Sequence, residues 1–414
     1  MSGGYFRTIN INNTNDNRKD KNKNVERGEN QSPLNEFKNI SNVSNNINDN
    51  KKEKYKEINQ EVIKKNLDFD SDRKSNYSNV KNVNENKQNV SNNINDNINT
   101  SDNIEDDNPN EVFEEKIIDK IDNLCKRGFN GPDVKKINQD NFFIYNNFNN
   151  NPNYVFMGVC DGHGLYGHHV SSFLANTLPQ NMNDNILEKN YDLATEKFSN
   201  LANIISDTFI STNIQLTDDG RIDITYSGST CVSALITSAK IICANVGDSR
   251  CVIGKFNGDK WFAKNLSRDH KPSIPEEHDR IIKAGGRVDT YKDGEHNGFG
   301  PQRVWLKNED TPGLAMSRSF GDEVAHKIGV ISEPEISEYY FLNEDKFIIM
   351  GSDGLWEFIK SDEVVNIVKD FYIKNDIQGA FEVLFKESSK RWLIEEGVID
   401  DITILIAFLK GKYQ

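Results

Sequence analysis

The chain has 414 residues and a formal net charge of −14, from 64 Asp and Glu against 50 Lys and Arg. This acidic balance disfavours a nucleic-acid-binding role, which needs clustered Lys and Arg, and no apolar run approaches the ~20 residues of a membrane span. The five cysteines form no CxxC pair and mostly lie in apolar runs, which indicates a reducing compartment. We therefore expect a cytoplasmic or nuclear monomer that acts without nucleic acid or membrane.

The N-terminal quarter differs in composition from the rest. Residues 1–110 are dominated by Asn, Asp, Lys, Ser and Glu, and the fragment SNNINDN occurs at both 44–50 and 91–97. Such a segment cannot bury enough apolar surface to offset the entropy of ordering. We expect a disordered, low-complexity Asn-rich arm over 1–110 and one large domain over 111–414.

Three segments open this domain. Residues 111–125 mix apolar and charged side chains and predict either a helix or a first strand at the domain border. Residues 142–145 predict a strand, and the apolar run 155–160 predicts a buried strand that ends at Asp161. The turn between these two strands contains Asn and Pro, which indicates a hairpin.

The pattern then changes to helical spacing. Apolar residues recur three or four positions apart over 170–178, and we expect Pro179 to end this helix. A second, longer stripe over 193–209 predicts another helix. We interpret both stripes as core packing.

Strands return in the second half of the chain. The segments 228–236, 240–246 and 250–254 predict three of them. A short helix is predicted over 275–284, where two glycines then stop it. Residues 291–313 are rich in Gly, Pro and charge, and predict a mobile loop.

The C-terminal part repeats this order. Residues 347–350 predict a strand, Ser361 is the expected N-cap of a helix to about 374, a second helix covers about 377–393, and 402–409 is the last strand. Strands, two helices, strands, two helices and a last strand indicate an α+β fold rather than βαβ alternation. We expect antiparallel sheets with helix pairs outside them.

Carboxylates stand at the ends of the predicted strands. Asp140 and Asp400 precede strands, whereas Asp161 and Asp353 follow them. Oxygen ligands suit hard divalent cations, and Gly162 lets the backbone approach closely enough for a carbonyl to be a further ligand. We expect one fold to gather these distant residues around metal.

Ten short motifs follow one another along residues 125–410. They are NQD (138–140), VCDGHG (159–164), SGST (227–230), ANVGDSR (244–250), RDHKP (268–272), AGGRV (284–288), RVWL (303–306), PGLAMSRSFGD (312–322), SDGLWE (352–357) and DDIT (400–403). In this order they resemble the metal-dependent protein phosphatase family, also called protein phosphatase type 2C. The resemblance implies a central antiparallel β-sandwich flanked by helix pairs, in α-β-β-α layers. It also implies Mg²⁺- or Mn²⁺-dependent hydrolysis of phosphoserine and phosphothreonine in phosphorylated protein substrates.

The resemblance further implies a site for two ions, which activate the attacking water. Asp161 would bridge both ions, and the Gly162 carbonyl would bind one of them. Asp353 and Asp400 would hold the other ion, with Asp140 ligating or adjoining the pair.

Other roles follow from the same resemblance. Asp248, with Asp353 and Glu357, resembles a third and weaker metal site. Lys135 or Lys136 takes the place of the basic phosphate-binding residue, which is arginine in the family. His163 is the candidate general acid for the leaving alkoxide.

Some positions depart from the family pattern. Gln139 stands where many members have Glu, which changes the set of ligands expected around the second metal. Asp401 stands where Asn is usual, so the choice of Asp400 as the ligand depends on register.

We expect Asp322 to be a structural turn acceptor.

Two other interpretations compete. Residues 162–167 fit GxGxxG between a strand and a helix, but a dinucleotide fold needs a second parallel strand ending in an acidic residue, and 179–190 instead predicts a polar loop. The second alternative is a catalytically weak pseudophosphatase that binds phosphoproteins without turnover. Loss of the metal-binding aspartates would favour it, and here they are present.

Overall fold

The computed structural model describes residues 116–131, 135–194, 197–291 and 298–410. The predicted Asn-rich arm over 1–110 therefore lies outside the described residues. Within the described ranges, every helix is too short or too polar to cross a bilayer.

In the described part of the chain, three sheets are built from antiparallel strand pairs. The five-stranded sheet has the order β1 (Ile118–Lys126), β15 (Ile402–Leu409), β14 (Asp345–Gly351), β7 (Arg250–Phe256) and β8 (Trp261–Asn265). The seven-stranded sheet has the order β12 (Phe320–Gly321), β4 (Gly228–Ser229), β3 (Val155–His163), β5 (Cys231–Ile236), β6 (Lys240–Val246) and β13 (Glu335–Tyr340), with β2 (Asp140–Asn146) also paired to β3. The small sheet has the order β11 (Pro312–Leu314), β10 (Phe299–Trp305) and β9 (Arg287–Tyr291).

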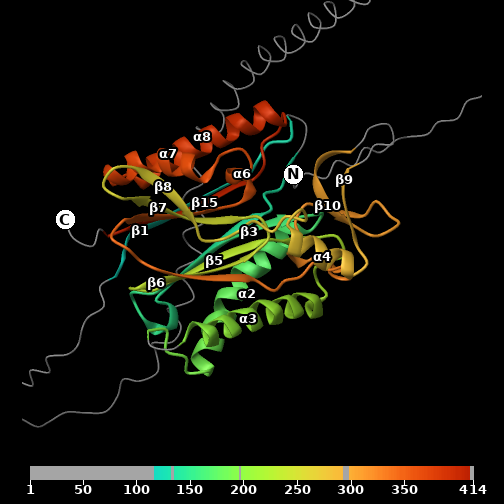
Figure 1. Cartoon of the computed structure of the whole chain (residues 1–414), viewed down its shortest axis with the longest axis horizontal. Helices are drawn as coiled ribbons and strands as arrows, with labels where there is room; N and C mark the ends of the chain where they lie inside the picture. The colour runs from blue at the N-terminus through green and yellow to red at the C-terminus, as the bar shows by residue number, and fades with distance from the viewer. Residues whose placement is uncertain (1–115, 132–134, 195–196, 292–297, 411–414) are drawn as a thin grey trace, which may run out of the picture. The chain divides into compact units, whose positions relative to one another are not determined.

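Helix pairs cover the outer faces of the two large sheets (Figure 1). On the seven-stranded sheet lie α2 (Gly167–Glu188) and α3 (Phe198–Asp219), and on the five-stranded sheet lie α7 (Ser361–Ile373) and α8 (Ile377–Glu395). The shorter elements are η2 (Phe148–Asn150), α4 (Pro275–Lys283), α5 (Glu323–His326) and α6 (Asp353–Trp356). The α+β prediction, with an antiparallel sandwich between helix pairs, is confirmed.

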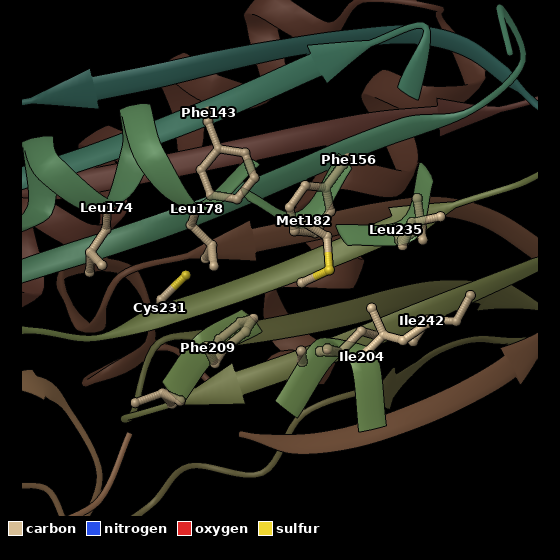
Figure 2. Close-up of a cluster of buried hydrophobic side chains, with 14 of the residues drawn as sticks. Phe143, Phe156, Leu174, Leu178, Met182, Ile204, Phe209, Cys231, Leu235 and Ile242 are labelled. Atoms are coloured by element: carbon tan, nitrogen blue, oxygen red, sulfur yellow. The ribbon is translucent and has the colours of Figure 1, made fainter. Parts of the chain in front are cut away.

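The central strand β3 is buried on both faces, which explains its continuous apolar sequence. Val155 and Met157 pack between the two sheets, whereas the alternate residues Phe156 and Cys160 face the helices. Figure 2 shows this second cluster, where Leu174 of α2 lies among side chains of the sheet and of α3.

Two predicted boundaries are wrong because tertiary contacts extend the elements. Strand β3 does not end at Asp161 but continues to His163, since its last residues pair with β4. Helix α2 does not end at Pro179 but runs on to Glu188. The buried side chains of Leu178 and Met182 continue the apolar stripe past the proline, so packing outweighs the lost backbone hydrogen bond.

Two further expectations also need correction. The segment 291–313 contains β10 and part of β11 rather than only a loop; residues 292–297 of it are outside the described part. The N-cap of α7 is Lys360, and Ser361 is its first helical residue, whose hydroxyl accepts a hydrogen bond from Arg250 instead. The ambiguous first segment of the domain contains a strand, β1.

Candidate metal and phosphate site

Two of the predicted ligands face each other across neighbouring strands. Asp140 at the start of β2 pairs directly with Asp161 near the end of β3, and both are buried. The Ser352 hydroxyl donates to Asp140 Oδ2 over 2.7 Å, which ties β2 to the end of β14. Burial and the charge of Asp401 raise the pKa of Asp140 to about 8.

Asp353 joins this pair from the other sheet. It begins α6 directly after β14, and its Oδ1 is buried without a hydrogen-bond partner. Burial and the charge of Asp400 raise its pKa to about 7. Burial and the charge of Asp353 likewise raise the pKa of Asp161 well above its ordinary value. These carboxylates therefore lie close enough to repel one another, which favours a bound cation.

The adjacent Asp400 and Asp401 have different partners. The Asp401 carboxylate accepts the backbone N–H groups of Gly128 (2.7 Å) and Gln139 (2.9 Å), so it holds the segment before β2 in place. Asp400 Oδ1 instead lies 2.5 Å from Lys136 Nζ. Asp401 is thus held by backbone donors of the segment before β2, whereas Asp400 is held by the ammonium of Lys136.

The two candidate lysines also differ. Lys135 is exposed, whereas Lys136 is partly buried between Asp400 and Asp401. Burial would lower the pKa of Lys136, but these two carboxylates raise it above its ordinary value. The structure thus brings Lys136, and not Lys135, to the acidic cluster.

Asp248 lies in the turn between β6 and β7, where a lysine holds it. Lys271 Nζ lies 2.5 Å from Asp248 Oδ2, while Asp248 Oδ1 is buried without a hydrogen-bond partner. Burial would raise the pKa of Asp248, but Lys271 lowers it. Glu357 is exposed. Lys271 is a site residue that the sequence reasoning did not identify, although its position in the RDHKP motif was a signal.

Gly162 lies where no side chain fits. A Cβ there would come within 2.3 Å of the Gly167 carbonyl oxygen and 2.6 Å of the Gln139 carbonyl oxygen. Its N–H donates to that Gln139 oxygen over 3.1 Å, and the Gln139 side chain donates to the Gly164 carbonyl over 2.7 Å. Gln139 therefore braces the turn at 162–164 through both its backbone and its side chain.

His163 has a carboxylate partner that is distant in sequence. Its Nε2 lies 2.6 Å from Asp322 Oδ2, while its Nδ1 is buried without a hydrogen-bond partner. Burial would lower the pKa of His163, but the charge and hydrogen bond of Asp322 raise it. Asp322 is thus more than the turn acceptor that the sequence led us to expect.

The candidate ligand atoms are of the kind that hard divalent cations prefer. They are carboxylate oxygens and a glycine carbonyl, and the unpartnered oxygens of Asp353 and Asp248 are buried acceptors without donors. Across the described ranges, no three or more His, Cys, Asp or Glu side chains converge tightly enough to hold an ion by themselves. Mg²⁺ is commonly held by one or two carboxylates and several waters, so the residues fit a hydrated ion rather than an all-protein cage.

Comparisons with known proteins point the same way. The family model described as protein phosphatase 2C matches residues 127–391. "Probable protein phosphatase 2C 35" of Arabidopsis thaliana is 34% identical over 303 residues, which cover 69% of this chain and 83% of the relative. "Probable protein phosphatase 2C 72" of the same plant is 33% identical, covering 68% of this chain and 84% of the relative. The crystal structure of a serine-threonine phosphatase 2C from Toxoplasma gondii shares the fold, with a TM-score of 0.60 at 20% identity over 70% of this chain and 94% of that one.

Proposed function

Because the chain belongs to the protein phosphatase 2C family of metal-dependent serine/threonine phosphatases, we propose that it hydrolyses phosphoserine and phosphothreonine in proteins at the acidic cluster around Asp161. The observation that carries this proposal is the set of buried carboxylates with raised pKa values at the meeting ends of β2, β3 and β14. A fold gains nothing in stability from crowding such groups, so a positively charged ligand is their best explanation.

We assign the following residues to a pair of Mg²⁺ or Mn²⁺ ions. Asp161 would contact both ions, the Gly162 carbonyl one of them, and Asp353 and Asp400 the other, with Asp140 beside the pair. Asp248 would serve a third, weaker position. When bound, such ions neutralise the phosphate dianion and lower the pKa of water.

The remaining chemistry belongs to side chains around this cluster. Lys136 places its ammonium 2.5 Å from Asp400, where it can attract a phosphate oxygen as a point charge, without the fork of an arginine. His163 keeps a free Nδ1 beside the carboxylates and has a raised pKa, so it can protonate the seryl or threonyl oxygen that leaves.

The test is hydrolysis of p-nitrophenyl phosphate and of a phosphoserine peptide by the full chain. We expect turnover in millimolar Mn²⁺ or Mg²⁺ and its loss in EDTA, with activity restored when the cation is added back. A folded protein that hydrolyses neither substrate in millimolar Mn²⁺ would instead favour the pseudophosphatase, which binds phosphoproteins without turnover.

A further inference from the structure

We propose that Asp322 is the residue that positions His163 for proton donation. It holds the imidazole by Nε2 and so leaves Nδ1 as the nitrogen that gives its proton to the leaving oxygen. This inference rests on the proposed phosphatase function and adds to it a positioning residue from a distant part of the chain.

The contact is short and enclosed. His163 and Asp322 are only 6% and 2% exposed, and their side chains meet at 2.6 Å. The hydroxyl of Ser319 donates to the same Oδ2 over 2.6 Å. Because a second donor fixes the carboxylate, Asp322 in turn fixes the imidazole ring with little freedom to rotate.

The sheet is shaped to let this contact form. Strand β4 lies between β3 and β12, and its Gly228 pairs with His163 on one side and Gly321 on the other. A Cβ at Gly228 would lie 2.2 Å from Asp322 Oδ2. Only glycine therefore leaves room for the carboxylate to pass over β4 and reach the histidine.

The backbone at Asp322 is in the left-handed region, with φ 48° and ψ 51°. Most residues with a side chain adopt this conformation at a cost that glycine avoids, and aspartate is among the few that tolerate it. Asp322 is also the N-cap residue of α5, yet its side chain makes no capping hydrogen bond to that helix. The carboxylate is therefore directed not by a cap but by its contacts with His163 and Ser319.

The proton balance of the step is simple. The bond between phosphorus and the seryl or threonyl oxygen breaks, and the oxygen of water forms the new bond to phosphorus and releases one of its protons to solvent. The leaving oxygen takes the proton of His163 Nδ1, which the imidazole regains from solvent before the next turnover. The Asp322 carboxylate accepts the hydrogen bond of Nε2 and keeps the ring in place during this transfer. An asparagine at 322 would retain the shape but lose the negative charge of this acceptor.

Leaving-group dependence separates positioning from mere structural support. A seryl alkoxide must be protonated as it leaves, whereas p-nitrophenolate leaves as a stable anion. We expect Asp322→Asn to lower kcat on a phosphoserine peptide by at least about tenfold, within the range of general acid catalysis, and kcat on p-nitrophenyl phosphate by less than about threefold. Ser319→Ala keeps the carboxylate but removes its second donor. It should lower the ratio of kcat on the phosphoserine peptide to kcat on p-nitrophenyl phosphate, to a smaller extent than Asp322→Asn does.

The matched control is Asp345→Asn. Asp345 is also a buried aspartate, but it lies at the opposite end of β14 from Gly351 and binds the Tyr339 hydroxyl and the Leu342 N–H. Both rates should be unchanged in this variant. If Asp322→Asn fails to fold, the ratio in Ser319→Ala decides the question.

The outcomes separate this inference from the proposed function. Equal losses on the two substrates, or no loss on either, would overturn the positioning role of Asp322 while leaving the phosphatase intact. Absence of cation-dependent turnover in the wild-type chain would instead refute the proposed function, and the inference with it.

Discussion

Glu277 offers a sharp test of how the region around the site is stabilised. Its carboxylate is 0% exposed and lies between two arginines: Arg280 donates to both oxygens at 2.8 and 2.7 Å, and Arg318 Nη2 donates at 2.7 Å. The Ser317 hydroxyl adds a donor at 2.6 Å. One carboxylate thus joins α4 to the segment that leads into β12.

Glu277→Gln should strongly destabilise the protein. The substitution keeps the volume of the side chain but leaves two guanidinium groups without their counter-charge. It also turns an amide N–H₂ group toward the arginine and serine donors, where it cannot accept their hydrogen bonds. Removing one partner of a buried ion pair typically costs about 3–5 kcal/mol, a large part of the ~5–15 kcal/mol that stabilises a folded domain. Equilibrium unfolding in urea at pH 7.5 measures this loss.

The control lies one residue away on the same helix. Glu276 pairs with Arg268, but its side chain is 57% exposed. Solvent screens such a surface pair, so Glu276→Gln should change the unfolding midpoint far less than Glu277→Gln. Equal effects of the two substitutions would refute the reasoning from burial.

The effect of Glu277 should also depend on pH. Burial would raise its pKa, but the hydrogen bonds from Arg280, Arg318 and Ser317 hold it well below its ordinary value of 4.5. A depressed folded-state pKa contributes stability above the unfolded-state value, and that contribution is lost as the pH falls toward the folded-state pKa. The stability gap between wild type and Glu277→Gln should therefore narrow as the pH drops below about 4.5. A gap that widens in acid would contradict the assignment.

Three further predictions concern the proposed function. Asp161→Asn or Asp353→Asn should lower kcat by orders of magnitude with an unchanged circular dichroism spectrum, and wild-type turnover by the double variant would refute the ligand assignment. A divalent cation at about 100 times its Kd should stabilise the wild type by about 2.7 kcal/mol, measured by thermal unfolding with and without EDTA, and Asp353→Asn should lose most of this gain. Deletion of residues 1–110 should leave kcat/KM on a phosphopeptide nearly unchanged, because that arm holds none of the assigned residues; a large drop would show that the arm contributes to catalysis or stability.

Apolar runs between clear turns predict the strands of the sandwich well. The patterns over 240–246 and 402–409 predict strands whose bounds match β6 and β15, since these strands are buried on both faces. The apolar pattern of the sequence does not predict strands whose side chains are only partly buried. Strand β9 is half exposed, and its sequence, RVDTY, has too little apolar content to predict a strand.

The acidic cluster was predictable because its members stand at strand ends, where an antiparallel sandwich brings them together. The partners of these residues were harder to find. His163 and Asp322 are 159 residues apart and meet only because β4 joins β3 to β12. A single sequence contains no periodicity that links them, and the left-handed backbone at Asp322 was hidden among the turn residues of SRSFGD.

The arrangement of charges implies that the site opposes the stability of its own fold. Asp140, Asp161 and Asp353 are buried side by side, and their raised pKa values mean that ionising them disfavours the folded state. Two lysines offset part of this repulsion at the edge of the cluster. Lys136 pairs with Asp400, and Lys271 pairs with Asp248. The carboxyl groups at the centre have no lysine partner of their own, so a divalent cation would favour their ionised forms where the cation-free fold disfavours them. Under the proposed ion assignment, ion binding and folding would therefore be coupled, because cations would release the repulsion that weakens the cation-free protein.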